Sequence, residues 1–274
     1  MKKYLAIVVA ALLLVCAFSS CANMSNGSID DYAPEIDYLI TEDGTFYFDE
    51  GDGETAILTN YVGKATSGDR VEIPSVFNDR TVTVIGDRAF YNLAAIVEVT
   101  IPDTIQEIGD YAFARCTELT EVTIPDAVLT IGEGAFIECT GLTKVTLGKE
   151  LEAIGDKAFN GCTALTSIDL PAGLETIGTG AFAFCKSLPA LVVPSSVLSV
   201  GEMAYTDCVG LESITFISEG TRIDDHAFEH ADGTNLKDKF VITGMSENSA
   251  VVTYVNSLSD SPETEPVTEA ADEE

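Results

Sequence analysis

Five cysteines recur at a fixed spacing of 23 residues, so their thiols could bind a metal, form disulfides or fill a buried column. They are Cys116, Cys139, Cys162, Cys185 and Cys208. Metal sites usually use close pairs such as Cys-x-x-Cys, which this chain lacks. Units stacked about 4.8 Å apart would bring neighbouring cysteines into disulfide range, but five thiols leave one unpaired. We therefore expect reduced, buried thiols, because free cysteine is among the most buried residue types.

Three other patterns could carry chemistry, and each has a simpler explanation. His226 and His230 would share one face of a helix and could bind zinc, but the glutamate of the catalytic zinc motif is missing after the first histidine. Gly178–Ala183 matches a dinucleotide-binding fingerprint without the required βαβ unit. The carboxylates of Asp49–Glu54 suit calcium, yet their spacing does not match an EF-hand and an acidic turn also explains them. We predict no catalytic residue, no metal, no cofactor and no enzymatic activity.

The cysteines belong to a longer repeated frame. One copy reads Ile131-Gly132, Ala135-Phe136, Cys139, Leu142 and Val145. Ile-Gly or Val-Gly pairs begin at positions 85, 108, 131, 154, 177 and 200. A period of this length is typical of solenoids, because one unit cannot bury its own apolar side without stacked neighbours. We attribute the glycine of each pair to a tight bend or a positive φ.

Within a unit the pattern predicts a strand and a short return segment. Glu121–Ile124 alternates polar and apolar residues, as a half-buried strand does. Gly132–Glu138 has room for about one helical turn. The predicted fold class is an α/β solenoid of 23-residue repeats, with a parallel strand ladder on the concave face and short helical turns or irregular segments on the return face. His226 occupies a return-segment position held elsewhere by Arg88, Tyr111, Gly134, Lys157, Gly180 and Met203, so we expect an exposed, unconstrained position.

The two ends of the chain predict export and attachment. Met1-Lys2-Lys3, the apolar run Tyr4–Phe18 and Ser19-Ser20-Cys21 make residues 1–21 a lipoprotein-type signal peptide with lipidation at Cys21; ordinary secretory cleavage is the alternative. The apolar run is too short to span a membrane, so membrane contact is expected only through the lipid anchor. Residues 22–36 are predicted to be a flexible tether, 37–80 an N-terminal β cap, 81–243 the solenoid, 244–256 a C-terminal cap and 257–274 an acidic disordered tail.

The net charge limits the classes of partner that the protein can bind. A formal charge of −31 would repel phosphate backbones, so nucleic acid is excluded as a partner. The same charge favours solubility at a crowded surface and leaves divalent or basic partners open.

The repeat resembles a known family. The order Cys-x-x-Leu-x-x-Val-x-Ile-Pro, continued by Ile-Gly-x-x-Ala-Phe, occurs from Cys116 to Phe136 and is similar to the BspA-like class of bacterial leucine-rich repeats over roughly residues 71–243. The resemblance implies a leucine-rich-repeat solenoid displayed at a bacterial cell surface or envelope. It also implies adhesion to, or binding of, host or neighbouring-cell proteins.

The expected binding residues are the polar positions that would stand in columns on the strand ladder. They are Glu98, Thr100, Glu121, Thr123, Lys144, Thr146, Ser167, Asp169, Ala190, Val192, Ser213 and Thr215. Pro189, Ala190 and Val192 interrupt the columns with an apolar patch. The predicted function is a non-catalytic cell-surface module that binds an unidentified surface or host protein. The alternatives are a glycan-binding or scavenging lipoprotein, which the lack of aromatic residues at these positions disfavours, and a structural envelope component without a specific ligand.

Overall fold

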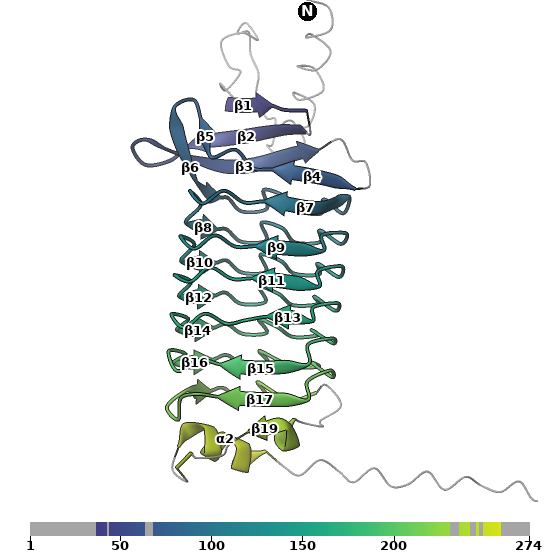
Figure 1. Ribbon diagram of the computed structural model, residues 1–274, viewed down its shortest axis with the longest axis vertical. Coiled ribbons are helices and arrows are strands. Elements are labelled where there is room, and N and C mark those ends of the chain that lie inside the picture. The colour runs from purple at the N-terminus through teal and green to yellow at the C-terminus, as the bar shows by residue number, and fades with distance from the viewer. Residues whose placement is uncertain are drawn as a thin grey trace, which may run out of the picture. The chain divides into compact units, whose positions relative to one another are not determined.

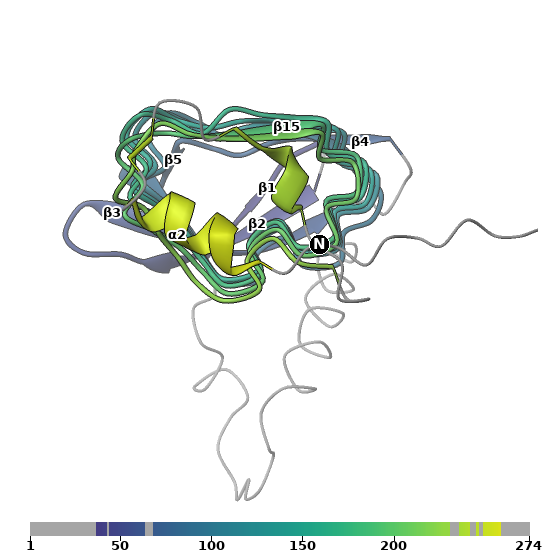
Figure 2. The same ribbon diagram turned by 90° about the horizontal axis from the view of Figure 1, so that it is seen from below.

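The computed structural model describes residues 37–258 except 43, 64–67, 231–235, 242–244 and 247–248. The predicted signal peptide with Cys21, the tether and almost all of the acidic tail lie outside the described residues. Among the residues described, no helix is long and apolar enough to cross a bilayer. The chain from Asp37 onward forms coils that stack one above another (Figure 1) and overlie each other when viewed along the stack (Figure 2).

Each coil contributes one strand to each of two ladders. The first, which we call the Ile-Gly ladder, runs in the order β3-β6-β8-β10-β12-β14-β16-β18, with every neighbouring pair parallel. Its strands are β3 (Thr55–Gly63), β6 (Arg80–Ile85), β8 (Glu107–Ile108), β10 (Thr130–Ile131), β12 (Ala153–Ile154), β14 (Thr176–Ile177), β16 (Ser199–Val200) and β18 (Arg222–Ile223). Eight strands in this ladder correspond to about eight turns of solenoid.

The second ladder is divided into two parallel sheets. One has the order β13-β11-β9-β7-β4 and the other β15-β17-β19. The strands are β4 (Asp69–Glu72), β7 (Ile96–Thr100), β9 (Glu121–Thr123), β11 (Lys144–Thr146), β13 (Ser167–Ile168), β15 (Ala190–Val193), β17 (Ser213–Phe216) and β19 (Phe240–Val241). A repeat solenoid with a parallel strand ladder is therefore confirmed.

The two ends of the stack are closed by other elements. At the N-terminal side, β1 (Asp37–Ile40), β2 (Gly44–Glu50) and β3 form an antiparallel meander, and β5 (Val76–Phe77) pairs with β6. At the C-terminal side follow a short 3₁₀-helix, η2 (Lys237–Lys239), and α2 (Ala250–Ser257). Ser249 caps α2 by accepting the N–H of Val252. The helix lies across the end of the stack (Figure 2), and the Tyr254 ring contacts the ring of Phe228 in the last coil.

The core contains a column of aromatic rings, one from each coil that begins at β6 or at a later strand of the Ile-Gly ladder. Ring centroids are 4.8–5.3 Å apart and the planes lie within 9° of parallel. This spacing is only slightly larger than the distance between adjacent strands. The backbone ladder therefore sets the distance between the rings. All the rings are fully buried. They are Phe90, Phe113, Phe136, Phe159, Phe182, Tyr205 and Phe228.

The return segment is not helical, and the prediction of short helical turns there is wrong. The N–H of Ala135 and of Ile137 bonds back three residues within the coil, whereas the N–H of Phe136 donates 2.7 Å to Ala158 of the next coil. Gly134 and Glu138 also have positive φ, 55° and 58°, which breaks a right-handed helix. Alternate amides therefore bond to the neighbouring coil and cannot form i→i−4 bonds. Within the described residues, α2 is the only α-helix.

The glycine of each Ile-Gly pair serves close packing between coils, and it lacks the positive φ that was one of the two predicted explanations. Gly132 and its equivalents are absent from the positive-φ positions. A Cβ added to Gly132 would lie 2.7 Å from the Gly109 carbonyl carbon and 2.8 Å from the Asp110 nitrogen. Backbone cannot yield as a flexible side chain can, so only glycine fits where coils approach this closely.

This contact predicts a difference between two glycine substitutions. Gly132→Ala should lower the free energy of unfolding by about 2–3 kcal/mol, because it forces two backbones apart. Gly161→Ala should cost only about 1 kcal/mol: Gly161 has a φ of 74°, but an added Cβ would meet nothing nearer than 3.6 Å. Urea unfolding of both variants measures the difference, and equal losses would contradict the close-approach explanation.

Candidate binding face

The twelve predicted binding residues lie along the outward side of the second ladder, which we call the display face. Ten are exposed, and Ser213 and Thr215 are half-buried. The intervening residues Val122, Val145 and Ile214 point inward and are buried. Alternation along each strand thus separates a core side from a solvent side. Asp169 lies just beyond the end of β13 but remains exposed.

Strand register places these side chains in columns. Glu121 is opposite Glu98 on one side and Lys144 on the other, and Lys144 is opposite Ser167. A second column pairs Thr123 with Thr146. The Arg70 guanidinium pairs with the Glu98 carboxylate at the start of the first column. The N-terminal half of the face therefore carries charges of both signs. Exposed ion pairs of this kind contribute at most about 1 kcal/mol each to the free energy of unfolding.

The other half of the display face is uncharged in both columns. Ala190 is opposite Ser213, and Val192 is opposite Thr215, which in turn is opposite Val241. Val192 is 54% and Ile217, directly after β17, is 61% exposed. The apolar interruption noted at Pro189, Ala190 and Val192 thus extends across three strands. Its desolvation would cost less than that of the charged half.

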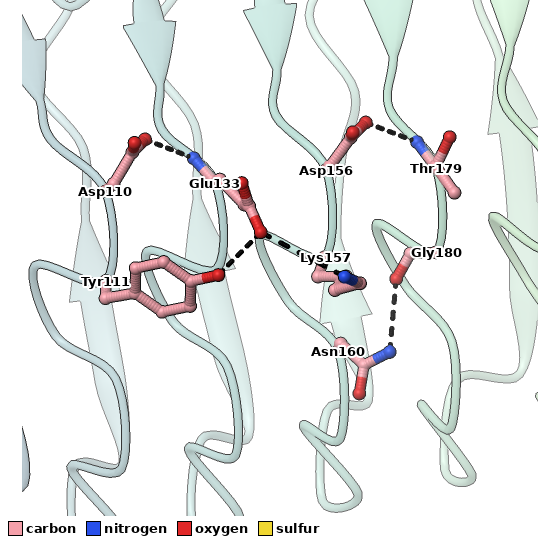
Figure 3. Close-up of polar contacts among 8 residues, drawn as sticks. All are labelled: Asp110, Tyr111, Glu133, Asp156, Lys157, Asn160, Thr179 and Gly180. Carbon is pink, nitrogen blue, oxygen red and sulfur yellow. Dashed lines mark hydrogen bonds and ion pairs between the residues drawn. The ribbon is translucent and has the colours of Figure 1, made fainter.

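A second polar surface follows the return segments. Asp110 Oδ1 accepts the backbone N–H of Glu133 at 2.7 Å, and Asp156 Oδ1 accepts that of Thr179 at 2.7 Å (Figure 3). These carboxylates join one coil to the next, so they are structural rather than free ligands. Sequence reasoning missed them, although Asp after Ile-Gly at positions 87, 110 and 156 was a usable signal.

Side chains on the same surface form one chain of contacts. The Tyr111 hydroxyl donates to Glu133 Oε1 at 2.5 Å, which raises the pKa of that tyrosine, and Lys157 Nζ lies 4.0 Å from the same oxygen (Figure 3). Asn160 donates to the Gly180 carbonyl at 3.4 Å. Arg88 lies over the Tyr111 ring. Because these groups satisfy one another, they leave fewer polar atoms for a partner than the display face does.

The position of His226 is constrained, contrary to the sequence interpretation. All seven equivalent residues have φ between 55° and 60°, the left-handed region; besides His226 they are Arg88, Tyr111, Gly134, Lys157, Gly180 and Met203. His226 Nδ1 contacts Glu229 at 2.7 Å, which raises the pKa of that histidine, and His230 lies 3.6 Å from Asp207. The helix that would align the two histidines does not form. No cluster of three metal-ligating side chains occurs among the described residues.

The acidic turn between β2 and β3 is bound by an arginine of this chain. Arg80 donates to Glu50 Oε1 at 2.8 Å and to the Gly53 carbonyl at 3.2 Å. A guanidinium therefore occupies part of the oxygen-rich surface that a calcium ion would need. This favours the interpretation as an acidic turn.

The cysteine column is buried and reduced, as predicted. Each thiol donates to the carbonyl of a phenylalanine in the preceding coil at 3.1–3.3 Å, for example Cys139 to Phe113. Burial raises the pKa of Cys116 and Cys208 to about 12, and it raises the pKa of the other three well above the usual range. These thiols are hydrogen-bond donors of the core and have no nucleophilic role at neutral pH.

Two small clefts occur on the described part of the chain. One, of about 250 Å³, is lined by Tyr61, Gly63, Asp69 and residues 92–96. The other, of about 350 Å³, lies between β18 and α2 and is lined by residues that include Arg222, Asp225 and Tyr254. The residues singled out as possible ligands do not converge in either cleft.

Residues 69–188 and 106–237 match the family described as "BspA type Leucine rich repeat region (6 copies)". The two matches together span more than half of the chain. The chain belongs to the BspA-type leucine-rich repeat family, as its repeat frame indicated.

Solved structures of bacterial leucine-rich repeat proteins are similar. A leucine-rich repeat protein from Bacteroides ovatus is 29% identical, with a TM-score of 0.61, and the match covers 70% of this chain and 52% of that one. A leucine rich cell surface protein from Faecalibacterium prausnitzii is 30% identical, with a TM-score of 0.53, covering 69% and 56%. This chain therefore matches only about half the length of either. No curated protein matches it significantly.

The buried thiols predict a pH-dependent stability. Below pH about 9 the thiols are protonated in both states, so their contribution is fully present. As the pH rises toward 12, the unfolded chain releases protons that the folded chain retains, and the free energy of unfolding should fall. Urea unfolding between pH 7 and 10.5 measures this, with the Cys139→Ala/Cys162→Ala double variant expected to show a shallower decline.

Thiol labelling provides the direct check. At pH 8 an alkylating reagent should leave all five ladder cysteines unmodified in the folded protein and modify all five in urea. Fast labelling of several ladder cysteines without denaturant would contradict the buried column.

Proposed function

We propose that this protein is an exported, lipid-anchored surface module that binds a protein partner along its display face and has no catalytic role. The observation that carries the proposal is the in-register outward columns of the second ladder. Within each of the two sheets the backbone pairing holds those side chains at fixed spacings, so little entropy is lost there on binding. Membership of the BspA-type family and likeness to a bacterial cell surface protein support display at a surface.

The composition of the face favours a protein partner. Protein interfaces combine an uncharged centre with a polar, solvated rim. Here the uncharged half formed by Ala190, Val192 and Thr215 adjoins the charged half that contains Glu121 and Lys144. The high negative charge of the whole chain would accelerate association with a basic partner and would make the rate sensitive to salt.

Lipidation at Cys21 would limit how far the module can lie from the membrane. Fifteen residues, 22–36, separate that cysteine from β1. Fully extended, they reach at most about 50 Å. The start of β1 would then stay within about that distance of the anchor.

A charge-matched pair of triple variants tests the face. Glu121→Ala, Lys144→Ala and Asp169→Ala together should weaken capture of a surface or host protein about tenfold or more, since each removes an exposed outward group. The midpoint of thermal unfolding should stay nearly unchanged, because exposed polar substitutions rarely affect stability. The measurement is binding of the mature protein to a partner isolated with the wild type.

The control triple replaces Glu107, Glu175 and Arg222 by alanine. It removes the same charges from exposed positions on or beside the Ile-Gly ladder. Capture should survive it. Equal weakening by the two triples would indicate a net-charge effect, and full capture by the first triple would refute the display-face assignment.

A further inference from the structure

The display face has a gap in its backbone pairing between two successive coils. The segments concerned, 166–170 and 189–193, belong to β13 and β15 with their flanking residues, and we call the line between them the seam. β13 is the last strand of one sheet and β15 the first of the other. All residues of both segments are described, and no backbone hydrogen bond joins them. Neighbouring pairs, β9 with β11 and β15 with β17, are in register.

Pro189 explains the gap. At this position of the repeat, the N–H of Thr143 donates to the Thr120 carbonyl at 2.8 Å, and the N–H of Thr166 donates to Thr143 at 2.9 Å. The two threonine hydroxyls donate to the same carbonyls at 3.0 and 3.1 Å. Pro189 is next in the column and has neither an N–H nor a hydroxyl. The column resumes one coil later, where Glu212 donates to the Pro189 carbonyl at 2.8 Å.

The rest of this coil boundary is intact. On the return side the N–H of Phe159 donates 2.7 Å to the Ala181 carbonyl, and on the Ile-Gly ladder β12 pairs with β14. Side chains close both ends of the seam: Ser187 donates to the Thr163 carbonyl at 2.8 Å and Ser196 to Leu174 at 2.6 Å. Two sides of the solenoid are thus continuous while the third is open.

Part of the core beneath the seam is less well covered than in the adjoining coils. Ile168 points inward but is only half-buried. Its equivalents one coil before and one coil after, Val145 and Leu191, are 2% and 3% exposed. Sparse hydrogen bonding and incomplete burial in one place mark a region that opens at low free-energy cost.

We propose that the seam is a flexure, that is, a line along which the solenoid bends. The display face opens and closes at this line, while the Ile-Gly ladder and the return segments act as the hinge. The charged columns that end at Ser167 and the uncharged columns that start at Ala190 then lie on two separate sheets. The angle between these sheets adapts to the partner. This use of the seam rests on the proposed function. Its existence does not.

Hydrogen exchange with a restoring substitution tests the seam. In the wild type, amides of 190–193 should exchange faster than those of 144–147 and 213–216, their equivalents in coils with intact pairing. Pro189→Thr returns both lost donors, so seam amides should exchange roughly two- to tenfold more slowly. Pro189→Ala, which returns only the N–H, should give a smaller effect. Pro102→Thr, a proline exchanged outside the seam, should leave seam exchange unchanged.

Distances across the seam test the bending itself. Spin labels at Glu98→Cys and Ser213→Cys should report a broad distance distribution that narrows with Pro189→Thr. Wild-type seam amides as protected as their neighbours, or an unchanged distribution in the Pro189→Thr protein, would overturn the proposal. The triple variants described above leave Pro189 untouched, so failure of the binding face and failure of the flexure are distinguishable.

Discussion

The structure depends on hydrogen bonds between the backbones of successive coils. In the return segment every second amide donates to the coil that follows, as Phe136 does to Ala158 and Phe159 to Ala181. These bonds fix the separation of the coils, and the separation fixes the stacking of the rings, the 3.1–3.3 Å contact of each thiol with a carbonyl and the close approach at the Ile-Gly glycines. A side chain that pushes two coils apart at one of these contacts also weakens the other contacts between the same coils, because all of them depend on the same separation.

That constraint also accounts for the chemistry of the molecule. Side chains that point inward are held in identical surroundings, so a thiol in the column is an unreactive core donor and not a nucleophile. Side chains that point outward are free to vary, and the display face uses that freedom. It changes from charged residues around Lys144 to aliphatic residues around Val192, while β9, β11 and β13 keep one backbone register and β15 and β17 keep another. Function in such a fold is carried by the sequence of exposed positions.

The repeat period made much of this predictable. The phase of Phe136, Cys139 and Val145 identified the core, and the alternation around Glu121 identified the face that points to solvent. The return segment could not be predicted, because residues as different as Lys157, Met203 and His226 share one left-handed conformation and none signals it. Ile-Gly was attributed to a tight bend or a positive φ, because the sequence shows a glycine but not the backbone of the adjacent coil that requires it. Pro189 was visible as a break in a polar column, but its consequence depends on the hydrogen bond that its neighbours make.

The most direct test of in-register stacking is a trans-hydrogen-bond scalar coupling measured by NMR. The account predicts a coupling between the Phe136 amide nitrogen and the Ala158 carbonyl carbon, with equivalents at Phe113 to Ala135 and Phe159 to Ala181. A coupling from the Phe136 nitrogen to the Gly132 carbonyl, four residues earlier, would show a helical return segment and would contradict it.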